Sequence, residues 1–590
     1  MGNAQPSRSH QLYPVAEGDV RESSSASAEQ QSSRKRLIEN VGFLILFVAL
    51  AFIVLFWRLG VSTFWDPDEA HYAETSRQMV VTGDWWAPFY NEQPFFDKPV
   101  LFHQLQGLAM LVLGQNELAA RIVPAFAALA LVFFTGWFGS VTRSRDTGLV
   151  AGLLLITSPG VFGLARYAIL DTLFTLFLFG GAALLAVAAL RDRSRLQWPG
   201  YVSIAIAIMV KGPLALVLCG LAFGLAIVSS AELRKRLLGL RWATGVVLAV
   251  IVASPWFAYM YVRFGQAFVQ GYVLDENLRL YASSRFANQP NFYFYFRILA
   301  AGLLPWTGLV IGRLYDDVRA LIRGEQLDPV ELLLWIWTVV IVLFFTLSTF
   351  KLDHYVFPAA PSLCLICARA WFDVRHAHRS PAHTGSRIGL HLIAPLVVAI
   401  GLGCGYFLIA RLELSRYAMM VPIALTVAGA SLAALANVRG GLPPRAPWIV
   451  LTAVGVTYAG LIAFVLPALE RRKVMDDMGH WVAAQRFAAA AAPRVASYRL
   501  PNPAFRFYAE QHVTFLDGAA ESRAFFEAPG PFYCLMRKAA FDGFVAQGVP
   551  LQIAYEREGL SVTSGRVLWR RHLPETHFVL ATRAAEAKRP

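Results

Sequence analysis

A stretch rich in charged and aromatic residues runs from Phe64 to Val100, directly after a long apolar run. It reads "FWDPDEAHYAETSRQMVVTGDWWAPFYNEQPFFDKPV" and carries Asp66, Asp68, Glu69, His71, Tyr72, Asp97 and Lys98. Carboxylates and histidines can move protons, and lysines can hold phosphate oxygens. Ionisable groups next to lipid are costly and usually mark function. The pattern therefore indicates chemistry at a membrane boundary.

Four later segments repeat this placement of ionisable groups at the ends of apolar runs. They contain Arg166, Tyr167 and Asp171 in "GLARYAILDTLF"; Lys211 in "VKGP"; Asp275, Glu276, Asn277, Arg279 and Arg285 in "YVLDENLRLYASSRFANQPNFYF"; and Lys351, Asp353, His354 and Tyr355 in "STFKLDHYVFP". If one membrane face holds all five segments, their acids and bases converge on one site.

Each of these residues also has a purely structural interpretation. Asp68 and Glu69 suit the first turn of a helix, where negative charge is favourable, and Asp171 could cap another helix. Single lysines at span ends often reach to the interface, and the aromatic residues fit an interfacial belt. The functional interpretation therefore depends on the convergence of several segments.

The elements that must position these residues are membrane helices. Of the 590 residues, 56% are hydrophobic and 16% are charged, whereas soluble proteins have roughly a quarter charged residues. We expect a polytopic α-helical membrane protein with an interfacial helix near 100–113. About thirteen apolar spans are predicted, at 38–58, 118–141, 146–166, 171–190, 197–210, 213–231, 242–262, 294–312, 331–348, 355–372, 388–410, 417–437 and 447–467.

Basic residues cluster in alternate short loops, which is the positive-inside pattern. The clusters are Arg34, Lys35 and Arg36; Arg143 and Arg145; Arg191, Arg193 and Arg195; Arg234, Lys235 and Arg236; Arg313, Arg319 and Arg323; Arg375 and Arg379; and Arg439 and Arg445. The net charge of +14 is thus a topology signal, and we expect no nucleic-acid partner. These loops and the N-terminus are predicted to be cytoplasmic. An odd number of spans then places the five acidic and basic segments and the C-terminal tail outside.

The chain divides into three predicted regions: a disordered cytoplasmic tail at 1–36, a transmembrane domain at 37–470, and a small extracytoplasmic α/β domain at 471–590. The last region alternates strand-like runs ("RVASY", "HVTFL", "PFYCLM", "LQIAYE", "RVLWRR") with helix-like runs ("NPAFRFYAEQ", "AAESRAFFE", "KAAFDGFVAQG"). It carries no phosphate loop or metal signature, which favours an accessory role.

A site on the outer face has no access to nucleotide sugars or ATP, so an activated donor must arrive as a lipid. A lipid phosphate needs cations for its oxygens, and an acceptor hydroxyl needs a base or an orienting carboxylate. Sugar transfer from a polyprenyl phosphate meets these demands, because the leaving phosphate gains charge that lysine and arginine can stabilise.

The segment from Asp66 to Ala125 resembles the first outer loop of the aminoarabinose transferases that modify lipid A. These belong to the C-type membrane glycosyltransferases, together with the protein O-mannosyltransferases. The similarity continues through "LD" at 170–171, "KGP" at 211–213, "PWF" at 255–257 and "KLDHYVFPAAPSL" at 351–363. It covers roughly residues 40 to 370, and the tail resembles the outer domain of that family more loosely.

The resemblance implies roles for particular residues. Asp68 would be the principal catalytic or acceptor-orienting carboxylate, Asp171 the second essential acid, and Glu69 a catalytic neighbour. Lys98 would grip the lipid phosphate. The remaining residues that would bind substrate are His71, Tyr72, Asp97, Lys211, Glu276, Arg279, Arg285, Lys351, His354 and Tyr355.

The sequence departs from the family pattern at four positions. His71 stands where an arginine is usual, Asp97 where a glutamate is usual, Val100 where a second proline is usual, and Asn277 where a histidine is frequent. Some members bind a divalent metal ion near the usual glutamate and histidine, which Asp97 and Asn277 replace here. Asp66, Asp68 and His71 could still bind one, so a metal cofactor stays open.

The resemblance implies a pentosyl- or hexosyltransferase in a bacterial inner membrane that modifies the cell envelope. Its partners would be an undecaprenyl-phosphate or other polyprenyl-phosphate sugar, a lipid or glycan acceptor such as lipid A, and membrane lipids. The identity of the sugar stays open, as does whether Asp68 is a base or orients an ionised acceptor. A flippase for a lipid-linked sugar is the alternative function.

Overall fold

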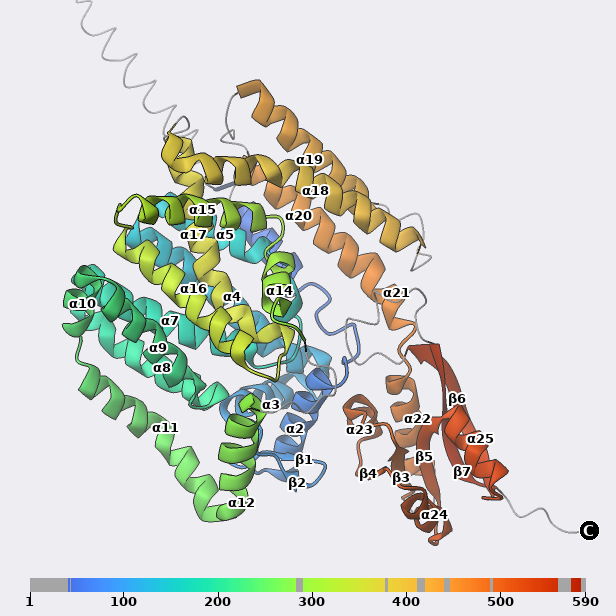
Figure 1. The fold of residues 1–590 in the computed structure, drawn as a ribbon. Helices are drawn as coiled ribbons and strands as arrows, with labels where there is room; N and C mark the ends of the chain where they lie inside the picture. Colours follow the sequence, from blue (N-terminus) through green and yellow to red (C-terminus); the bar gives the residue numbers. More distant parts are fainter. Residues whose placement is uncertain are drawn as a thin grey trace, which may run out of the picture. The chain divides into compact units, whose positions relative to one another are not determined.

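The computed structural model describes residues 41–42, 44–282, 290–376, 380–410, 420–439, 446–488, 492–560 and 575–584. The chain forms two compact units, Met1–Leu50 and Ala51–Pro590. In the first unit the described residues are helical. The predicted tail at 1–36 lies outside the described residues. The second unit contains the helices and strands that are labelled in Figure 1.

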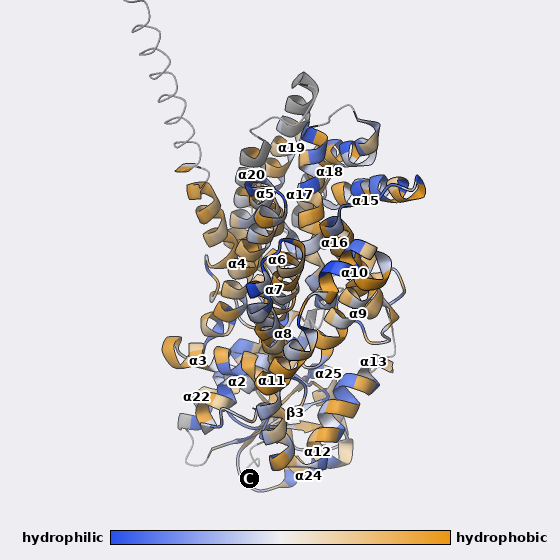
Figure 2. Ribbon diagram, turned by 90° about the vertical axis from the view of Figure 1, so that its left-hand side faces the viewer, coloured by the Kyte–Doolittle hydropathy of each residue, from blue (hydrophilic) through white to orange (hydrophobic). Residues whose placement is uncertain are grey.

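Apolar helices make up most of the second unit. Their bounds are α4 (Glu117–Thr142), α5 (Arg145–Thr157), α6 (Pro159–Ala165), α7 (Asp171–Leu190), α8 (Gln197–Lys211), α9 (Leu214–Ser229), α10 (Ala231–Leu238), α11 (Trp242–Phe264), α12 (Gln266–Phe268), α13 (Leu280–Ala282), α14 (Phe294–Gly302), α15 (Thr307–Ile322), α16 (Pro329–Leu347), α17 (Ala360–His376), α18 (Thr384–Ala410), α19 (Met420–Arg439), α20 (Ala446–Gly460) and α21 (Leu466–Glu470). Short 3₁₀ or π-helical turns lie between them: η1 (Ser194–Leu196), η2 (Val269–Arg279), η3 (Asp353–Ala359), η4 (Pro381–His383) and η6 (Leu461–Val465). Figure 2 shows apolar residues along helices such as α4 and α11.

Within the described residues, seven helices are long and apolar enough to cross a membrane, or nine if each bent helix pair counts as one span. This confirms a multi-pass helical membrane protein but not the predicted number of thirteen spans. The predicted span at 146–166 is bent by 65° between α5 and α6, and the span at 294–312 is bent by 117° between α14 and α15. Four other predicted spans fall short: α8 and α9 are 15 and 16 residues long, and the spans 38–58 and 417–437 contain the shorter apolar helices Leu44–Leu55 and Val421–Ser431 among their described residues.

Membrane helices α15, α16 and α17 share a buried charge cluster away from the residues predicted to form the site. Arg313 of α15 donates to Glu331 of α16 at 2.6 and 2.7 Å and to Asp373 of α17 at 2.8 Å. Arg369 of α17 lies 3.2 Å from the same Glu331. Buried charges are tolerated when they are paired in this way, so this cluster has a structural explanation.

The segment between the first apolar helix and α4 folds into α2 (Asp68–Thr82), a two-stranded hairpin of β1 (Phe89–Tyr90) and β2 (Gln93–Pro94), and α3 (Leu101–Leu113). Helix α2 ends at Gly83, whose φ of 73° is the left-handed conformation that glycine adopts readily at a helix C-cap. Met79 at the end of α2 packs with Val100 and with Trp256 of α11. This packing holds the C-terminal end of α2 and thereby helps to fix the position of its acidic N-terminal turn.

The C-terminal region contains a five-stranded sheet of order β4-β3-β5-β7-β6. The strands are β3 (Arg494–Tyr498), β4 (Val513–Leu516), β5 (Phe532–Arg537), β6 (Leu551–Leu560) and β7 (Glu575–Arg583), and the helices are α22 (Met475–Ala488), α23 (Pro503–Ala509), α24 (Ala519–Glu527) and α25 (Lys538–Ala546). Strand β3 is parallel to β4 and β5, whereas β7 is antiparallel to β5 and β6.

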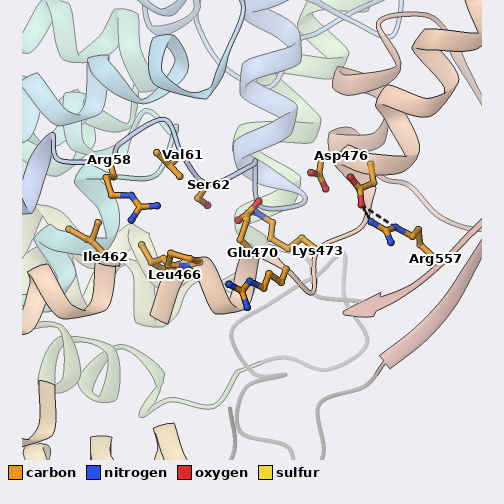
Figure 3. A pocket seen from close by; sticks show the side chains of 12 residues that line it. Arg58, Val61, Ser62, Ile462, Leu466, Glu470, Lys473, Asp476 and Arg557 are labelled. Carbon is orange, nitrogen blue, oxygen red and sulfur yellow. Dashed lines mark hydrogen bonds and ion pairs between the residues drawn. The ribbon is translucent and has the colours of Figure 1, made fainter. Parts of the chain in front are cut away.

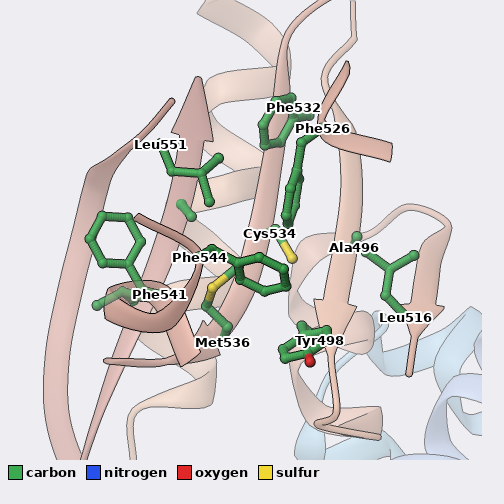
Figure 4. Close-up of a cluster of buried hydrophobic side chains, with 12 residues drawn as sticks. Ala496, Tyr498, Leu516, Phe526, Phe532, Cys534, Met536, Phe541, Phe544 and Leu551 are labelled. Carbon is green, nitrogen blue, oxygen red and sulfur yellow. The ribbon is translucent and has the colours of Figure 1, made fainter. Parts of the chain in front are cut away.

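Alternation of apolar residues along these strands gives the sheet two buried faces. Cys534 and Met536 of β5 pack with Phe526 of α24 and Phe544 of α25 (Figure 4). The intervening Leu535 faces the other side and packs with Met478 of α22. Since successive side chains of a strand point to opposite faces, helices cover both sides of the sheet.

Candidate active site

Asp68 and Glu69 occupy the first turn of α2, but their surroundings differ. Asp68 is partly buried and has no ion-pair partner within 4.0 Å among the described residues. Glu69 is fully buried and accepts two bonds from Arg121 of α4, from Nε at 2.6 Å and from NH2 at 2.8 Å. The backbone N–H groups of Trp65 and Ala168 also donate to Glu69, at 3.0 and 2.9 Å. Glu69 is therefore fixed on all sides, whereas Asp68 is not.

Arg121 is the second half of this clamp. Besides Glu69, its guanidinium donates to the carbonyl oxygens of Leu59, Ser62 and Thr63, at 3.1, 2.5 and 3.0 Å. A single side chain thus ties α4 to both the loop before α2 and α2 itself. Sequence reasoning missed Arg121; the available signal was a lone arginine near the start of a predicted membrane span.

Asp171, Lys211 and His354 meet from three separate elements. Asp171 begins α7, Lys211 ends α8, and their side chains form a buried ion pair. His354 of η3 places Nε2 3.6 Å from Asp171 Oδ2, while its Nδ1 lies 3.2 Å from Asp353 Oδ1. The Lys211 ammonium also lies 4.5 Å from the centroid of the Tyr355 ring, a cation–π contact. The structure thus brings together four residues that the sequence placed in one site.

Asp68 belongs to the same electrostatic cluster. Burial raises the pKa of the Asp68 carboxyl above its ordinary value, and the nearby charges of Asp171 and Asp353 raise it further. His354 and Lys98 act in the opposite direction and favour the ionised form. Two carboxyl groups from distant segments, Asp68 and Asp171, therefore face a shared set of cations.

Lys98 connects the first loop with the segment after α11. Its ammonium lies 3.7 Å from Glu276 Oε2 in η2 and donates to the carbonyl oxygen of Asp97 at 2.9 Å. The Lys98 side chain is 15% exposed. Lys98 is therefore held in place by two partners, and a small part of its side chain stays exposed.

His71 and Tyr72 line the buried side of α2. The His71 ring lies 4.0 Å from the Tyr90 ring and 4.8 Å from the Phe95 ring, centroid to centroid. Burial lowers the pKa of His71 to about 4, so this side chain is neutral near pH 7. Tyr72 stacks on His103 at 5.6 Å, and burial raises its pKa. His71 therefore does not supply the positive charge that an arginine would.

Two other predicted cations, Arg279 and Lys351, contact groups outside the cluster around Asp68. Arg279 pairs with the exposed Asp275 on its own turn at 2.6 Å. Lys351 donates to the carbonyl oxygen of Ser348. Arg285 lies outside the described residues.

The described residues do not fit the metal site that stayed open from the sequence. No group of three His, Cys, Asp or Glu side chains in the described part of the chain is arranged to hold a metal ion. The Lys98 ammonium is instead the cation beside Glu276, at 3.7 Å.

Helix α23 of the C-terminal region braces α2 and the loop before it. Arg506 Nε lies 3.1 Å from Glu74 Oε1 of α2, and the Ala504 N–H donates to Asp66 at 2.8 Å. The Tyr508 hydroxyl accepts from the Phe64 N–H at 2.9 Å and donates to Glu117 at 2.7 Å. Figure 1 shows α23 near α2, which it contacts. Sequence reasoning missed this brace, because it joins residues more than four hundred positions apart.

Comparisons with known proteins extend these observations. Residues 41–269 match the family described as dolichyl-phosphate-mannose-protein mannosyltransferase. The chain is 30% identical over 362 residues to an undecaprenyl phosphate-alpha-4-amino-4-deoxy-L-arabinose arabinosyl transferase of Erwinia tasmaniensis, covering 60% of this chain and 62% of that protein. A protein of the same name (number 1) from Sodalis glossinidius is 31% identical over 335 residues, 56% of this chain and 58% of that protein. The matches thus span about three fifths of the length of these relatives.

The fold has a close counterpart among solved structures. The crystal structure of ArnT from Cupriavidus metallidurans bound to undecaprenyl phosphate superposes with a TM-score of 0.71, at 20% identity, over 93% of this chain and 99% of that one. The apo state of the same protein gives a TM-score of 0.72. The resemblance to the C-type membrane glycosyltransferases, and among them to the aminoarabinose transferases, is thereby confirmed.

Proposed function

We propose that this protein transfers a monosaccharide from a polyprenyl-phosphate donor to an acceptor at the outer face of the membrane. The observation that carries the proposal is the convergence of Asp68 and Lys98 of the first loop with Asp171 and His354, which come from two later segments of the chain, on one electrostatic cluster. The names of the similar proteins support the donor class: two relatives are undecaprenyl-phosphate sugar transferases.

Lys98 holds the donor phosphate in this mechanism. The sugar's anomeric carbon loses its bond to a phosphate oxygen, and the phosphate diester becomes a monoester with additional negative charge. An ammonium beside that oxygen is stabilising at the moment the charge develops. Lys98 is suited to this role because Glu276 and the Asp97 carbonyl position its ammonium.

Asp68 acts on the acceptor. An acceptor hydroxyl attacks the anomeric carbon as its proton passes to the carboxylate, so the new C–O bond forms opposite the breaking one and the configuration inverts. The raised pKa of Asp68 makes its carboxylate a stronger base than an exposed aspartate. If the acceptor is a phosphate, it is already ionised, and Asp68 orients it instead.

Asp171, Lys211 and His354 form a preorganised charge array. Because Asp171 is paired with Lys211 and approached by His354, it keeps a fixed position. We assign it the task of orienting these cations toward the donor or acceptor. We assign Glu69 a positioning role, since Arg121 and two backbone N–H groups occupy its carboxylate.

The sidedness of the reaction follows from the distribution of basic residues. With a cytoplasmic N-terminus and one span before it, the loop that carries Asp68 lies outside. The C-terminal α/β region contacts this loop through Ala504 and Arg506 and therefore lies on the same side. Lipid A or another glycan of the bacterial cell envelope is then the acceptor, and the inner membrane is the location.

The test is a transfer assay with the purified full chain in proteoliposomes, using a panel of polyprenyl-phosphate sugars and a bacterial lipid extract as acceptor. Donor binding is measured separately. We expect Asp68→Asn to abolish transfer of the accepted sugar while donor binding persists. The control variant is Glu92→Gln, which removes an exposed carboxylate from the same loop and should transfer normally.

The outcomes separate the two functions considered. Normal turnover by Asp68→Asn would remove Asp68 from the reaction. Movement of the lipid-linked sugar between leaflets without any transferred product would favour the flippase.

A further inference from the structure

A cavity of about 370 Å³ lies apart from the cluster around Asp68 (Figure 3). It is bounded by residues 58–62 after the first apolar helix, the end of the last apolar helix, the start of α22, and Arg557 of β6. Its volume falls within the range of small-molecule sites, roughly 300–1,000 Å³. The proposed reaction does not use it.

One side of this cavity is apolar. Ile462, Leu466 and Pro467 line it from the helix Thr452–Glu470, which is long and apolar enough to cross a membrane. Val61 adds a further apolar side chain. Charged residues complete the lining where that helix ends. The lining therefore changes from apolar to charged at the end of a helix of membrane-spanning length.

Most of the charges in the wall already have partners. Glu470 accepts from the Thr63 N–H at 2.8 Å and lies 3.3 Å from the Lys473 ammonium. Asp477 pairs with Arg557. These four side chains form two ion pairs, each with no net charge.

Two arginines and one carboxylate remain. Arg58 and Arg471 are exposed, and neither has a carboxylate within 4.0 Å in the described part of the chain. Asp476 Oδ1 is buried and has no hydrogen-bond partner among the described groups. A buried polar atom without a partner costs free energy, so a donor from a ligand would be favourable there.

A membrane phospholipid with an amine in its headgroup matches each of these features. A phosphodiester is a monoanion that arginine binds well, an ammonium can donate to Asp476, and an acyl chain can lie along Ile462 and Leu466. A free phosphate would leave the apolar wall uncovered. A phospholipid without an amine would leave Asp476 Oδ1 without a partner, although backbone N–H groups bond to the carboxylate.

We propose that this cavity binds one aminophospholipid, with its phosphate between Arg58 and Arg471, its ammonium at Asp476 and a chain on Ile462 and Leu466. The site adjoins the loop that precedes Asp68, because Glu470 bonds to Thr63 and the Lys473 ammonium lies 4.2 Å from the Trp65 ring centroid. Bound lipid therefore stabilises the wall that supports this loop.

The experiment is native mass spectrometry of the delipidated full chain titrated with phosphatidylethanolamine, phosphatidylglycerol and chain-free glycerophosphoethanolamine. We expect one saturable phosphatidylethanolamine site and at least tenfold weaker binding of the other two. In the double variant Arg58→Gln/Arg471→Gln, phosphatidylethanolamine should bind at least tenfold more weakly. In Asp476→Asn, the preference over phosphatidylglycerol should disappear.

The control is Arg323→Gln, which removes an exposed arginine after α15 and should leave phosphatidylethanolamine binding unchanged. Charge-conserving Arg58→Lys/Arg471→Lys should retain most of the affinity, which separates lost charge from misfolding. Unchanged binding in the glutamine double variant would overturn the proposal, as would an equal loss in Arg323→Gln. Glycerophosphoethanolamine binding as tightly as the lipid would also overturn it.

Discussion

The Glu69 carboxylate lies 2.6 Å from Arg121 Nε, whereas its neighbour Asp68 has no ion-pair partner among the described residues. Two adjacent acids in one helical turn thus have opposite surroundings. Removing each charge should therefore have opposite consequences for stability and for transfer.

Asp68→Asn should lower transfer by about 10²–10⁴-fold, the usual contribution of a positioned general base, and leave the thermal midpoint nearly unchanged. Glu69→Gln should destabilise the fold by about 3–5 kcal/mol, because it leaves the buried Arg121 without its counter-charge. Transfer assays and thermal unfolding of both variants in detergent check this. A destabilised Asp68→Asn with a normal Glu69→Gln would reverse the assignment.

Lys98→Ala should weaken donor binding by about 10–100-fold. The variant loses a charge-assisted contact with the donor phosphate, and such contacts contribute about 1.5–3 kcal/mol. Isothermal titration with a polyprenyl-phosphate sugar measures the change, and Lys98→Arg should recover part of the affinity. The control is Lys538→Ala, which removes an exposed lysine of α25. An unchanged dissociation constant in Lys98→Ala would remove Lys98 from the phosphate site.

Hydropathy located the apolar segments of the chain but did not predict where the helices within them bend. The predicted span 146–166 is interrupted before Pro159, which begins α6 and lacks the N–H that would continue α5. The predicted span 294–312 turns by 117° around residues 303–306, which include Pro305. Counting apolar residues along a segment cannot detect such turns, because a bent pair of helices and one straight helix can have the same apolar composition.

Local patterns located most C-terminal elements. The run "RVASY" coincides with β3 and "AAESRAFFE" with α24. Strand β7 was missed because "ETHFVLATR" begins and ends with polar residues, although it pairs with both β5 and β6. The predicted strand "RVLWRR" lies outside the described residues.

The position of ionisable residues at the ends of the predicted spans identified the acids and bases of the site. It did not identify the residues with which they pair. Asp171, Lys211 and His354 were placed together because topology put three segment ends on one face. The pairs Glu69–Arg121 and Glu74–Arg506 could not be predicted, since each depends on packing between distant elements.

Asp66 should make stability depend on pH. Burial raises its pKa from 3.8 to about 7, although the Ala504 N–H and Lys473 act against the shift. Between about pH 4 and 7 the folded chain keeps this proton while the unfolded chain has lost it, so stability falls as the pH rises through this interval and is level above it. Asp66→Asn removes the dependence and keeps an acceptor for Ala504.

Thermal midpoints across this interval test the prediction. The midpoint of Asp66→Asn, relative to the unmodified chain, should increase with pH. Asp542→Asn, which changes an exposed aspartate of α25, serves as the control and should show no such trend. A constant difference between Asp66→Asn and the unmodified chain would show that Asp66 is ionised throughout.

Arg506→Gln should lower kcat without weakening donor binding. Arg506 lies 3.1 Å from Glu74 of α2 and is 5% exposed, so it helps to hold the helix that carries Asp68, whereas Lys98 lies outside this helix, after the β1–β2 hairpin. Small displacements of a catalytic group are costly, and we expect a loss of about tenfold or more. Glu74 keeps Arg77 at 2.7 Å, so the fold should survive. Steady-state kinetics and donor titration separate the two effects.

The matched control for this brace is Arg523→Gln, whose guanidinium donates to the Gln547 side chain at 2.7 Å on the surface. It should leave both kcat and donor affinity unchanged. If folded Arg506→Gln keeps its full kcat, α23 does not position Asp68. If donor affinity falls in step with kcat, the brace acts on the whole loop that includes Lys98, because a displaced loop would move the phosphate contact together with the carboxylate.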